Sequence, residues 1–164
     1  KLQGEDVSKA IDLYYTRFAS NVSNIVFTDH TLHLEKIEIL NATQFEGLPQ
    51  LNWGDDLNLK IRFKLFKEID ESLKIKLVIF DKEQRPVALL LDLDFDYSKI
   101  VTDETLSFLM VHENLQLSKG VYSVNLVATN DSGIVYRANS ISDFQIVHEL
   151  EVWEPFLLKS EVKV

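Results

Sequence analysis

The stretch Leu117-Ser-Lys-Gly120-Val-Tyr122 constrains the fold of this chain more than any other part of its sequence. In a tyrosine corner, a Tyr near the start of a strand hydrogen-bonds to the backbone a few residues upstream and fixes the arch between two sheets. Gly120 and Tyr122 have the required spacing, and the residues after Tyr122 alternate between two faces. The inward residues are Val124, Leu126 and Ala128, and the outward residues are Ser123, Asn125 and Val127. The stretch therefore predicts a Greek-key β-sandwich.

Most of the remaining chain alternates with the period of two that is typical of half-buried strands. The predicted strands are Thr31 to Leu40, Leu57 to Phe66, Leu73 to Phe80, Val87 to Phe95, Thr105 to His112, Val121 to Thr129, Ile134 to Arg137 and Ser142 to Val147. They recur at intervals of roughly ten residues and are separated by turns such as Asn130-Asp-Ser-Gly133. In the first of them the alternation changes phase near Lys36, which indicates a β-bulge. The sequence therefore predicts an all-β antiparallel sandwich.

The first stretch of the chain has a helical period instead. Its apolar residues from Val7 to Phe18 recur at spacings of three and four. Glu5 and Asp6 fall in the first turn, where the helix dipole favours acidic side chains. Residues 1–20 are therefore predicted to form an amphipathic linker helix that leads into a β-sandwich domain of residues 21–164.

The C-terminal segment is apolar but has no obvious place in a complete sandwich. Pro155 interrupts the strand pattern, because proline cannot donate a ladder hydrogen bond. Residues 156–164 then form another strand-like segment. We expect this segment either to fold back on its own sheet or to pair with a second copy of the chain, and the second arrangement predicts a homodimer.

Composition and charge exclude several functional classes. The formal net charge is -9, which repels nucleic-acid backbones and anionic membrane surfaces. The chain has no Cys, so core packing alone must hold the sheets together. The longest apolar run, Val87 to Leu91, is far shorter than the roughly 20 residues that span a bilayer. We therefore expect a soluble protein with no nucleic-acid partner.

No arrangement of residues in the sequence indicates catalysis, a metal or a cofactor. No Ser lies in a Gly-x-Ser-x-Gly turn, and the five Gly residues do not cluster as they do in phosphate-binding loops. His30 and His33 come closest to a metal cluster, but in an extended strand they point to opposite faces. We therefore expect a domain that is not an enzyme.

Asp92, Asp94 and Asp96 share one face of a predicted strand and admit two interpretations. The first is a solvated face of opposite charges across a hairpin. That register pairs Ile79 with Leu89, Leu77 with Leu91, Lys76 with Asp92 and Lys74 with Asp94. The second interpretation is recognition of hydroxyl groups or of a metal ion by the carboxylates.

The aromatic residues indicate a surface able to bind sugars, since aromatic faces stack on pyranose rings. Phe66 and Phe80 fall on the outward phase of their strands, and Trp53, Tyr97 and Tyr136 fall at strand ends or in loops. The competing interpretation is that Phe66 and Phe80 support the N-terminal helix or a dimer partner. For Trp53, which precedes a Gly, a structural role at a turn is the simpler interpretation.

Several motifs together resemble the C-terminal, carbohydrate-binding domain of the ATP-binding subunit in Wzt-type polysaccharide ABC transporters, which export O antigen. Gly4-Glu-Asp-Val7 through Tyr14 is similar to the helix that ends the nucleotide-binding domain of that family. Trp53-Gly54-Asp-Asp-Leu57-Asn-Leu59-Lys-Ile61 is similar to the Gly-acidic turn that launches an early strand. The corner at Leu117 to Tyr122 and the closing Phe144-Gln-Ile146-Val, with its tail through Trp153, extend the likeness over nearly the whole chain.

The resemblance implies an immunoglobulin-like sandwich that recognises a finished glycan at the cytoplasmic face of the bacterial inner membrane before export. It also implies a homodimer made by exchange of C-terminal strands, and a transporter permease reached through an upstream ATP-binding domain. The family carries no catalytic residues in this domain.

Because glycan contacts differ with the glycan, the predicted site rests on exposure and residue type alone. We predict a site on an outward sheet face, with Phe66 or Tyr136 as the stacking ring. Its other residues are Arg62, Asp92, Asp94, Tyr97 and Asn125. The alternative functions are a structural dimerisation module of the transporter subunit and an extracellular adhesin-type immunoglobulin-like domain, and the predicted entry helix counts against the adhesin.

Overall fold

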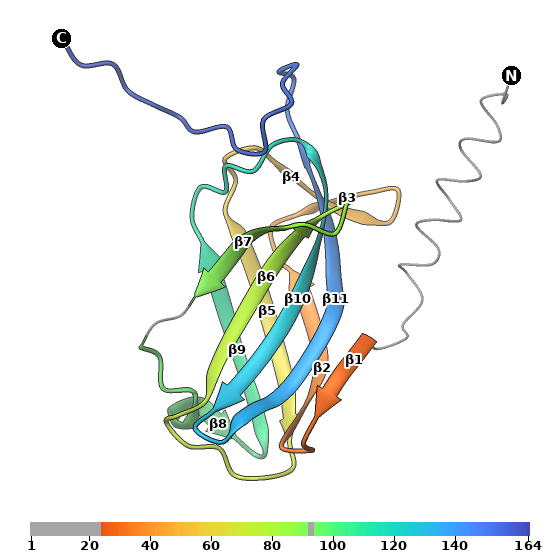
Figure 1. The fold of residues 1–164 in the computed structure, drawn as a ribbon, viewed down its shortest axis with the longest axis vertical. Coiled ribbons are helices and arrows are strands. Elements are labelled where there is room, and N and C mark those ends of the chain that lie inside the picture. Colours follow the sequence, from red (N-terminus) through yellow and green to blue (C-terminus); the bar gives the residue numbers. More distant parts are fainter. Residues whose placement is uncertain (1–23, 92–93) are drawn as a thin grey trace, which may run out of the picture.

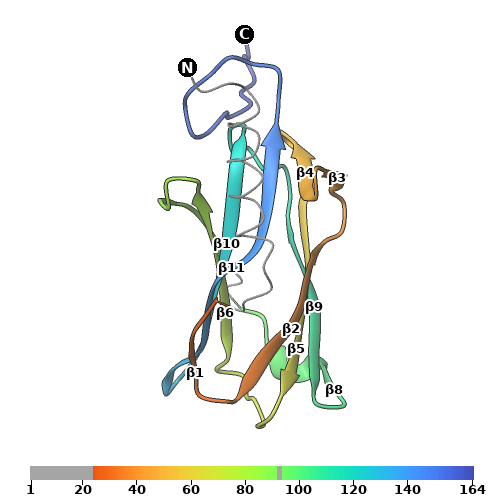
Figure 2. The same cartoon turned by 90° about the vertical axis from the view of Figure 1, so that its right-hand side faces the viewer.

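Residues 24–91 and 94–164 are described in the computed structural model of the chain. The predicted helix of residues 1–20 and the predicted site residue Asp92 lie outside the described residues. Two β-sheets pack face to face, the larger one toward the viewer in Figure 1 and to the left in Figure 2. The predicted all-β sandwich is therefore confirmed.

The larger sheet has seven strands in the spatial order β3-β4-β11-β10-β6-β7, with β1 also paired to β11. They are β1 (Asn24–Thr28), β3 (Thr43–Phe45), β4 (Leu48–Asn52), β6 (Lys74–Asp81), β7 (Pro86–Leu91), β10 (Gly120–Asn130) and β11 (Gly133–Val147). The smaller sheet has the order β2-β5-β9-β8. Its strands are β2 (Leu32–Ile39), β5 (Leu57–Leu65), β8 (Val101–Thr102) and β9 (Thr105–His112), and a short 3-10 helix, η1 (Tyr97–Ile100), precedes β8.

The core lies between the sheets and follows the alternation of the sequence. On β5 the buried residues are Leu57, Leu59, Ile61, Phe63 and Leu65. Ile75, Leu77 and Ile79 on β6 are buried as well, as are the predicted inward residues of β10, Val124, Leu126 and Ala128. Full burial of one large apolar side chain stabilises a fold by about 1.5–3 kcal/mol, so these rows hold the two sheets together without a disulfide.

The phase change predicted in the first strand is a bulge of β2. The register between β2 and β5 shifts between Leu34 and Lys36. Leu32 remains fully buried on one side of the bulge, and Ile37 packs against the core on the other. The bulge therefore returns apolar residues to the core after the alternation has slipped.

The two strands predicted near the end of the sandwich form one bent strand, β11. Its register with β10 passes from Ala138 opposite Leu126 directly to Ser142 opposite Val124, so three residues of β11 have no partner on β10. One of them, Ser140, has a φ of 47°, and its N–H donates to Asn125 Oδ1 at 2.7 Å. This side-chain hydrogen bond replaces the missing ladder bond, so the strand bends without ending.

The sandwich is not antiparallel throughout, which corrects the prediction. β4 runs parallel to β11, with Gln50 opposite Gln145 and Leu51 opposite Ile146. Leu51 is buried and anchors this short strand, while Gln145 Nε2 donates to Gln50 Oε1 at 2.9 Å. The short β4 was not recognisable from its sequence, because Pro49 cannot donate a ladder hydrogen bond.

The β6–β7 hairpin has a register one residue away from the predicted one. It pairs Leu77 with Leu90 and Lys76 with Leu91, and the register shifts between Ile79 and Phe80. β7 ends at Leu91, before the acidic residues. The predicted pairs of Lys76 with Asp92 and Lys74 with Asp94 are therefore wrong.

The slip exchanges the two faces of β7, because successive side chains of a strand point to opposite sides. Leu90 enters the core, whereas Leu89 and Leu91 are exposed to 49% and 51%. The consequence is an apolar stripe on the outside of an edge strand.

Tyr122 lies at the start of β10 in the predicted corner. Its hydroxyl donates to the Ser118 carbonyl oxygen at 2.7 Å, which is the hydrogen bond of a tyrosine corner. Its ring stacks on Phe144 with ring centroids 5.6 Å apart. Burial, with the charge of Asp81, raises the pKa of Tyr122 to about 12, so the hydroxyl keeps its proton at ordinary pH.

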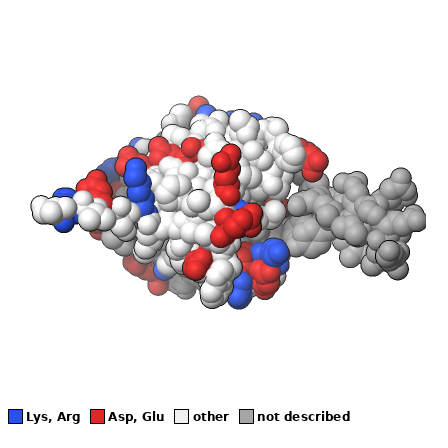
Figure 3. Space-filling view, turned by 90° about the horizontal axis from the view of Figure 1, so that it is seen from above, with Lys and Arg blue, Asp and Glu red and all other residues white. Residues whose placement is uncertain are grey.

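The surface at the end of the sandwich where the C-terminal tail lies (residues 155–164) is mostly uncharged, with more acidic than basic groups (Figure 3).

In the described ranges, no helix is long and apolar enough to cross a membrane.

Candidate functional site

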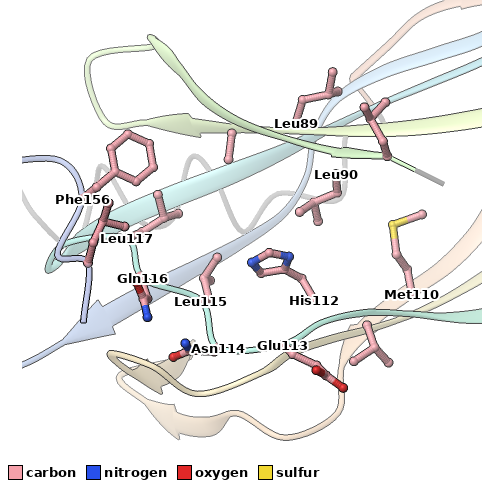
Figure 4. Close-up of a pocket in the computed structure, with 14 residues that line it drawn as sticks. Leu89, Leu90, Met110, His112, Glu113, Asn114, Leu115, Gln116, Leu117 and Phe156 are labelled. Carbon is pink, nitrogen blue, oxygen red and sulfur yellow. The ribbon is translucent and has the colours of Figure 1, made fainter. Parts of the chain in front are cut away.

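One side of the sandwich is open between two strand edges. β7 is the last strand of the larger sheet, and β8 covers only Thr105 and Leu106 at the start of β9. A groove of about 590 Å³ lies between β7 and the end of β9 (Figure 4). Residues of the β9–β10 connection and of the tail complete its lining.

Apolar side chains make up most of the groove. They are Ala88, Leu89, Leu90, Leu91, Met110, Val111, Leu115, Leu117, Phe156 and Leu158. Leu89, Leu91 and Val111 are each about half exposed. A continuous exposed apolar surface of this kind marks a binding site more often than a free surface.

Polar groups are interspersed with the apolar ones. His112, Glu113, Asn114 and Gln116 also line the groove. Figure 4 shows the His112 ring directed into the space between Leu90 and Leu115. Imidazole, carboxylate and amide groups together offer both hydrogen-bond donors and acceptors, so the groove can hold a ligand with apolar and polar faces.

The turn before β5 fixes the polar end of the groove. Gly54 N donates to the Leu115 carbonyl and Leu115 N donates to the Asp55 carbonyl, both at 2.9 Å. Asn114 N donates to Asp56 Oδ1 at 2.9 Å. Gly54 has a φ of +85°, a conformation that glycine adopts without strain. The Gly-acidic turn of the sequence therefore positions the residues that line the groove.

The tail folds back beside the same connection. Ser118 N donates to the Pro155 carbonyl and Leu157 N donates to the Gln116 carbonyl, both at 3.0 Å. Trp53 Nε1 donates to the Leu157 carbonyl at 2.9 Å. These contacts bring Phe156, which is 45% exposed, to the end of the groove.

The predicted site residues are not brought together. Arg62 lies on the outer face of the smaller sheet, where its Nε is 3.0 Å from Glu35 Oε2, and Phe66 follows β5 and is exposed. Asn125 lies on the outer face of the larger sheet, on the opposite side of the sandwich. Asp94 is exposed beyond the end of β7.

The prediction that Tyr97 and Tyr136 are exposed is wrong, since only 2% and 1% of their surfaces are accessible. Tyr97 begins η1, and its ring centroid lies 5.0 Å from that of Phe108, which packs against the core. Tyr136 lies inside β11, with its ring edge-on to Phe63 at 6.2 Å. Neither ring can stack on a sugar at the surface, so they serve the core.

Sequence reasoning missed a second polar surface, on the outer face of the larger sheet. Ser123 lies between Phe80 and Asp143 on the neighbouring strands. Ser123 was predicted to point outward, and it is on the outer face, but its side chain is buried among its neighbours. Burial raises the pKa of Asp143 to about 6. The alternation of β10 predicted the face of Ser123, but the pairing of Ser123 with Asp143 and the burial of both residues depend on neighbours from other strands.

In the described part of the chain, no group of three His, Asp or Glu side chains could hold a metal ion. His33 instead packs edge-on against Tyr136 with ring centroids 6.5 Å apart.

Comparisons with known proteins give a fold and no family. No protein-family model matches the chain, and no curated protein is similar to it in sequence. Among solved structures, it is similar to a Niemann-Pick type C2 protein from the Japanese carpenter ant, with a TM-score of 0.55 and 11% identity over 77% of this chain and 99% of that one. That likeness supports the sandwich fold alone.

Two further structures are less similar. The alkylpurine DNA glycosylase AlkC of Pseudomonas fluorescens, bound to DNA with an abasic site analog, has a TM-score of 0.49 and 8% identity over 74% of this chain and 32% of that one. The PmoD soluble domain of Methylocystis sp. has a TM-score of 0.38 and 18% identity over 77% of this chain and 99% of that one. These likenesses support no inference about function.

Proposed function

We propose that this chain is a non-catalytic domain that recognises a polysaccharide, of the kind that ends the ATP-binding subunit of Wzt-type ABC transporters. The support from the sequence is that its motifs have structural roles in the fold. The Gly54 turn precedes β5, and its hydrogen bonds position residues that line the groove. The corner at Tyr122 fixes the crossing between the two sheets. The closing strand carries the buried Phe144. In this proposal the sandwich is of the immunoglobulin-like type.

The observation that carries the proposal is the open groove of about 590 Å³ with mixed apolar and polar lining. The C–H faces of pyranose rings pack on apolar side chains. Sugar hydroxyls give up hydrogen bonds to water and form hydrogen bonds to groups such as His112 and Gln116. Each such hydrogen bond gains only about 0.5–1.5 kcal/mol net. A few contacts and one stacked ring therefore give an affinity in the micromolar to millimolar range.

Phe156 takes the role of stacking ring that the sequence assigned to Phe66 or Tyr136. It is the aromatic ring of the groove lining and is 45% exposed. Phe66 is more exposed, at 65%, but lies outside the groove, which makes it a matched control.

The test is a calorimetric or NMR titration of the whole chain with the purified polysaccharide of the organism that encodes it. Phe156→Ala is expected to weaken binding by at least about tenfold, and Phe66→Ala is expected to leave it unchanged. Equal binding by wild type and both variants would show that the groove is not the glycan-binding site. Circular dichroism checks that each variant is folded.

The cellular setting follows from the same family. The domain acts at the cytoplasmic face of the bacterial inner membrane and is coupled to a permease through an upstream ATP-binding domain. As a homodimer it presents two sites to the repeating units of one polymer, and avidity compensates for the weak single site.

The second candidate function is a structural dimerisation module, which the apolar tail favours. Leu158 and Val162 are exposed to 71% and 92%, and Val164 is fully exposed. Such a segment buries its apolar side chains when it pairs with a second chain. In this function the groove receives no glycan, so wild-type protein would not respond to the titration.

A further inference from the structure

The outer face of the larger sheet has polar groups that the chain itself leaves unpaired. Ser123 Oγ is buried, and no hydrogen-bond partner for it exists in the described residues. Only 6% of the Ser123 surface is exposed. A buried polar atom without a partner costs free energy, so a native protein that keeps one on a surface face calls for an explanation.

Two rows of side chains run across this face. In the first row, Phe80 on β6, Ser123 on β10 and Asp143 on β11 are direct cross-strand neighbours. In the second row, Leu89 on β7, Val78 on β6 and Asn125 on β10 are neighbours. Each row therefore runs from an apolar side chain near the sheet edge to a polar one nearer its middle.

Asn125 and Asp143, the polar residues that end the two rows, have hydrogen-bonding groups available to a ligand. Asn125 Oδ1 accepts from Ser140 N, which leaves the amide Nδ2 free to donate. No hydrogen bond or ion pair engages the Asp143 carboxylate in the described residues, and burial already raises its pKa to about 6. A donor amide and an acceptor carboxylate on the same sheet face together match hydroxyl groups, which both accept and donate.

The face is continuous with the groove through Leu89. This residue lines the groove and is also the edge member of the second row. A polysaccharide has more sugar units than the groove can hold. The sugar units adjacent to those in the groove therefore contact the surface that continues from it.

We infer that the outer face of the larger sheet, around Phe80, Asn125 and Asp143, is a second part of the glycan-binding surface and takes the sugar units adjacent to the groove. This inference rests on the proposed function. The ligand class is a neutral, hydroxyl-rich glycan, because a chain with a net charge of -9 and a carboxylate at this place repels an anionic one.

The experiment compares oligosaccharides of one repeat and of several repeats from the cognate polysaccharide, titrated calorimetrically into the whole chain. Wild type is expected to bind the longer oligosaccharide more tightly. Asp143→Asn is expected to weaken binding of the longer one by at least about tenfold while binding of the single repeat is unchanged. Asn125→Asp keeps the acceptor for Ser140 N but removes the donor, and is expected to act in the same direction.

Glu35→Gln is the matched control, since it removes the same charge from the outer face of the smaller sheet and is expected to change neither affinity. Asp143→Asn and Asn125→Asp variants that bind the longer oligosaccharide like wild type would overturn the inference and leave the proposed function standing. Equal wild-type affinity for both lengths would overturn it too. No wild-type binding at either length would overturn the proposed function, and the inference with it.

Discussion

At the scale of single residues, Tyr122 fixes the crossing of the chain between the two sheets. Its buried hydroxyl donates to the Ser118 carbonyl at 2.7 Å. Tyr122→Phe keeps the ring on Phe144 but removes this hydrogen bond, and is expected to lower the free energy of unfolding by about 1–1.5 kcal/mol. Urea denaturation measures the change as a lower midpoint with an unchanged slope. An unchanged midpoint would mean that the corner does not depend on the hydroxyl.

Asp143 makes stability depend on pH in the direction opposite to a salt-bridged acid. Burial raises its pKa in the folded state from 3.8 to about 6, so the folded chain holds this proton more tightly than the unfolded chain. Its contribution to stability is fully present below the unfolded pKa and is lost as the pH rises through about 6.

Asp143→Asn removes the titrating carboxyl and therefore the loss of stability that its ionisation causes as the pH rises. Above about pH 7 the variant is therefore expected to be more stable than wild type. The expected gain in the free energy of unfolding is only about 1 kcal/mol, because the carboxyl is partly solvated. Near pH 4 this gain in stability is expected to vanish. Urea midpoints of both proteins across this range measure the difference. A difference that stays constant with pH would show that Asp143 does not titrate as described.

At the scale of elements, the register of β7 decides which leucines belong to the core. Leu90 is 8% exposed and Leu89 is 49% exposed. Leu90→Ala is expected to cost about 2–5 kcal/mol, whereas Leu89→Ala is expected to cost less than about 1 kcal/mol. Denaturation midpoints of the two variants compare them directly. The reverse order would support the predicted register, in which Leu89 and Leu91 face the core.

The success of sequence reasoning differed between β5 and β7 for a physical reason. In β5 polar residues alternate with apolar ones, so only the apolar face can enter the core, and that face is buried. In β7 the run Val87-Ala-Leu-Leu-Leu91 has no polar face, so alternation does not distinguish one register from the next. The shift between Ile79 and Phe80 on the neighbouring strand sets the register instead.

The candidate site was predictable only in parts. Asn125 lies on an outer face because the alternation of β10 is regular, whereas Tyr136 was misplaced because Val135 and Tyr136 are both buried next to an irregular hairpin. The groove joins β7, the end of β9 and the tail, which are far apart in the sequence. Its composition depends on which strands form the edges of the sheets, and local patterns carry no information on that.

At the scale of the whole molecule, the tail is expected to hold a homodimer. The described contacts attach residues 155–159 to the chain's own connection, whereas Val162 and Val164 are exposed. Deletion of residues 160–164 is therefore expected to yield monomer while the groove stays intact. Light scattering measures the molar mass of both proteins. A stable dimer after deletion would place the interface elsewhere, such as on the predicted N-terminal helix.

The central claim is that the whole chain recognises one polysaccharide. Titration calorimetry of the wild-type chain with its cognate polysaccharide, and in parallel with an unrelated neutral one, tests it most directly. We predict saturable binding of the cognate polymer with a dissociation constant between about 1 μM and 1 mM per repeat, and no measurable heat with the unrelated one. Equal heats with both polymers, or no heat with either at millimolar repeat units, would contradict the account and favour the dimerisation module.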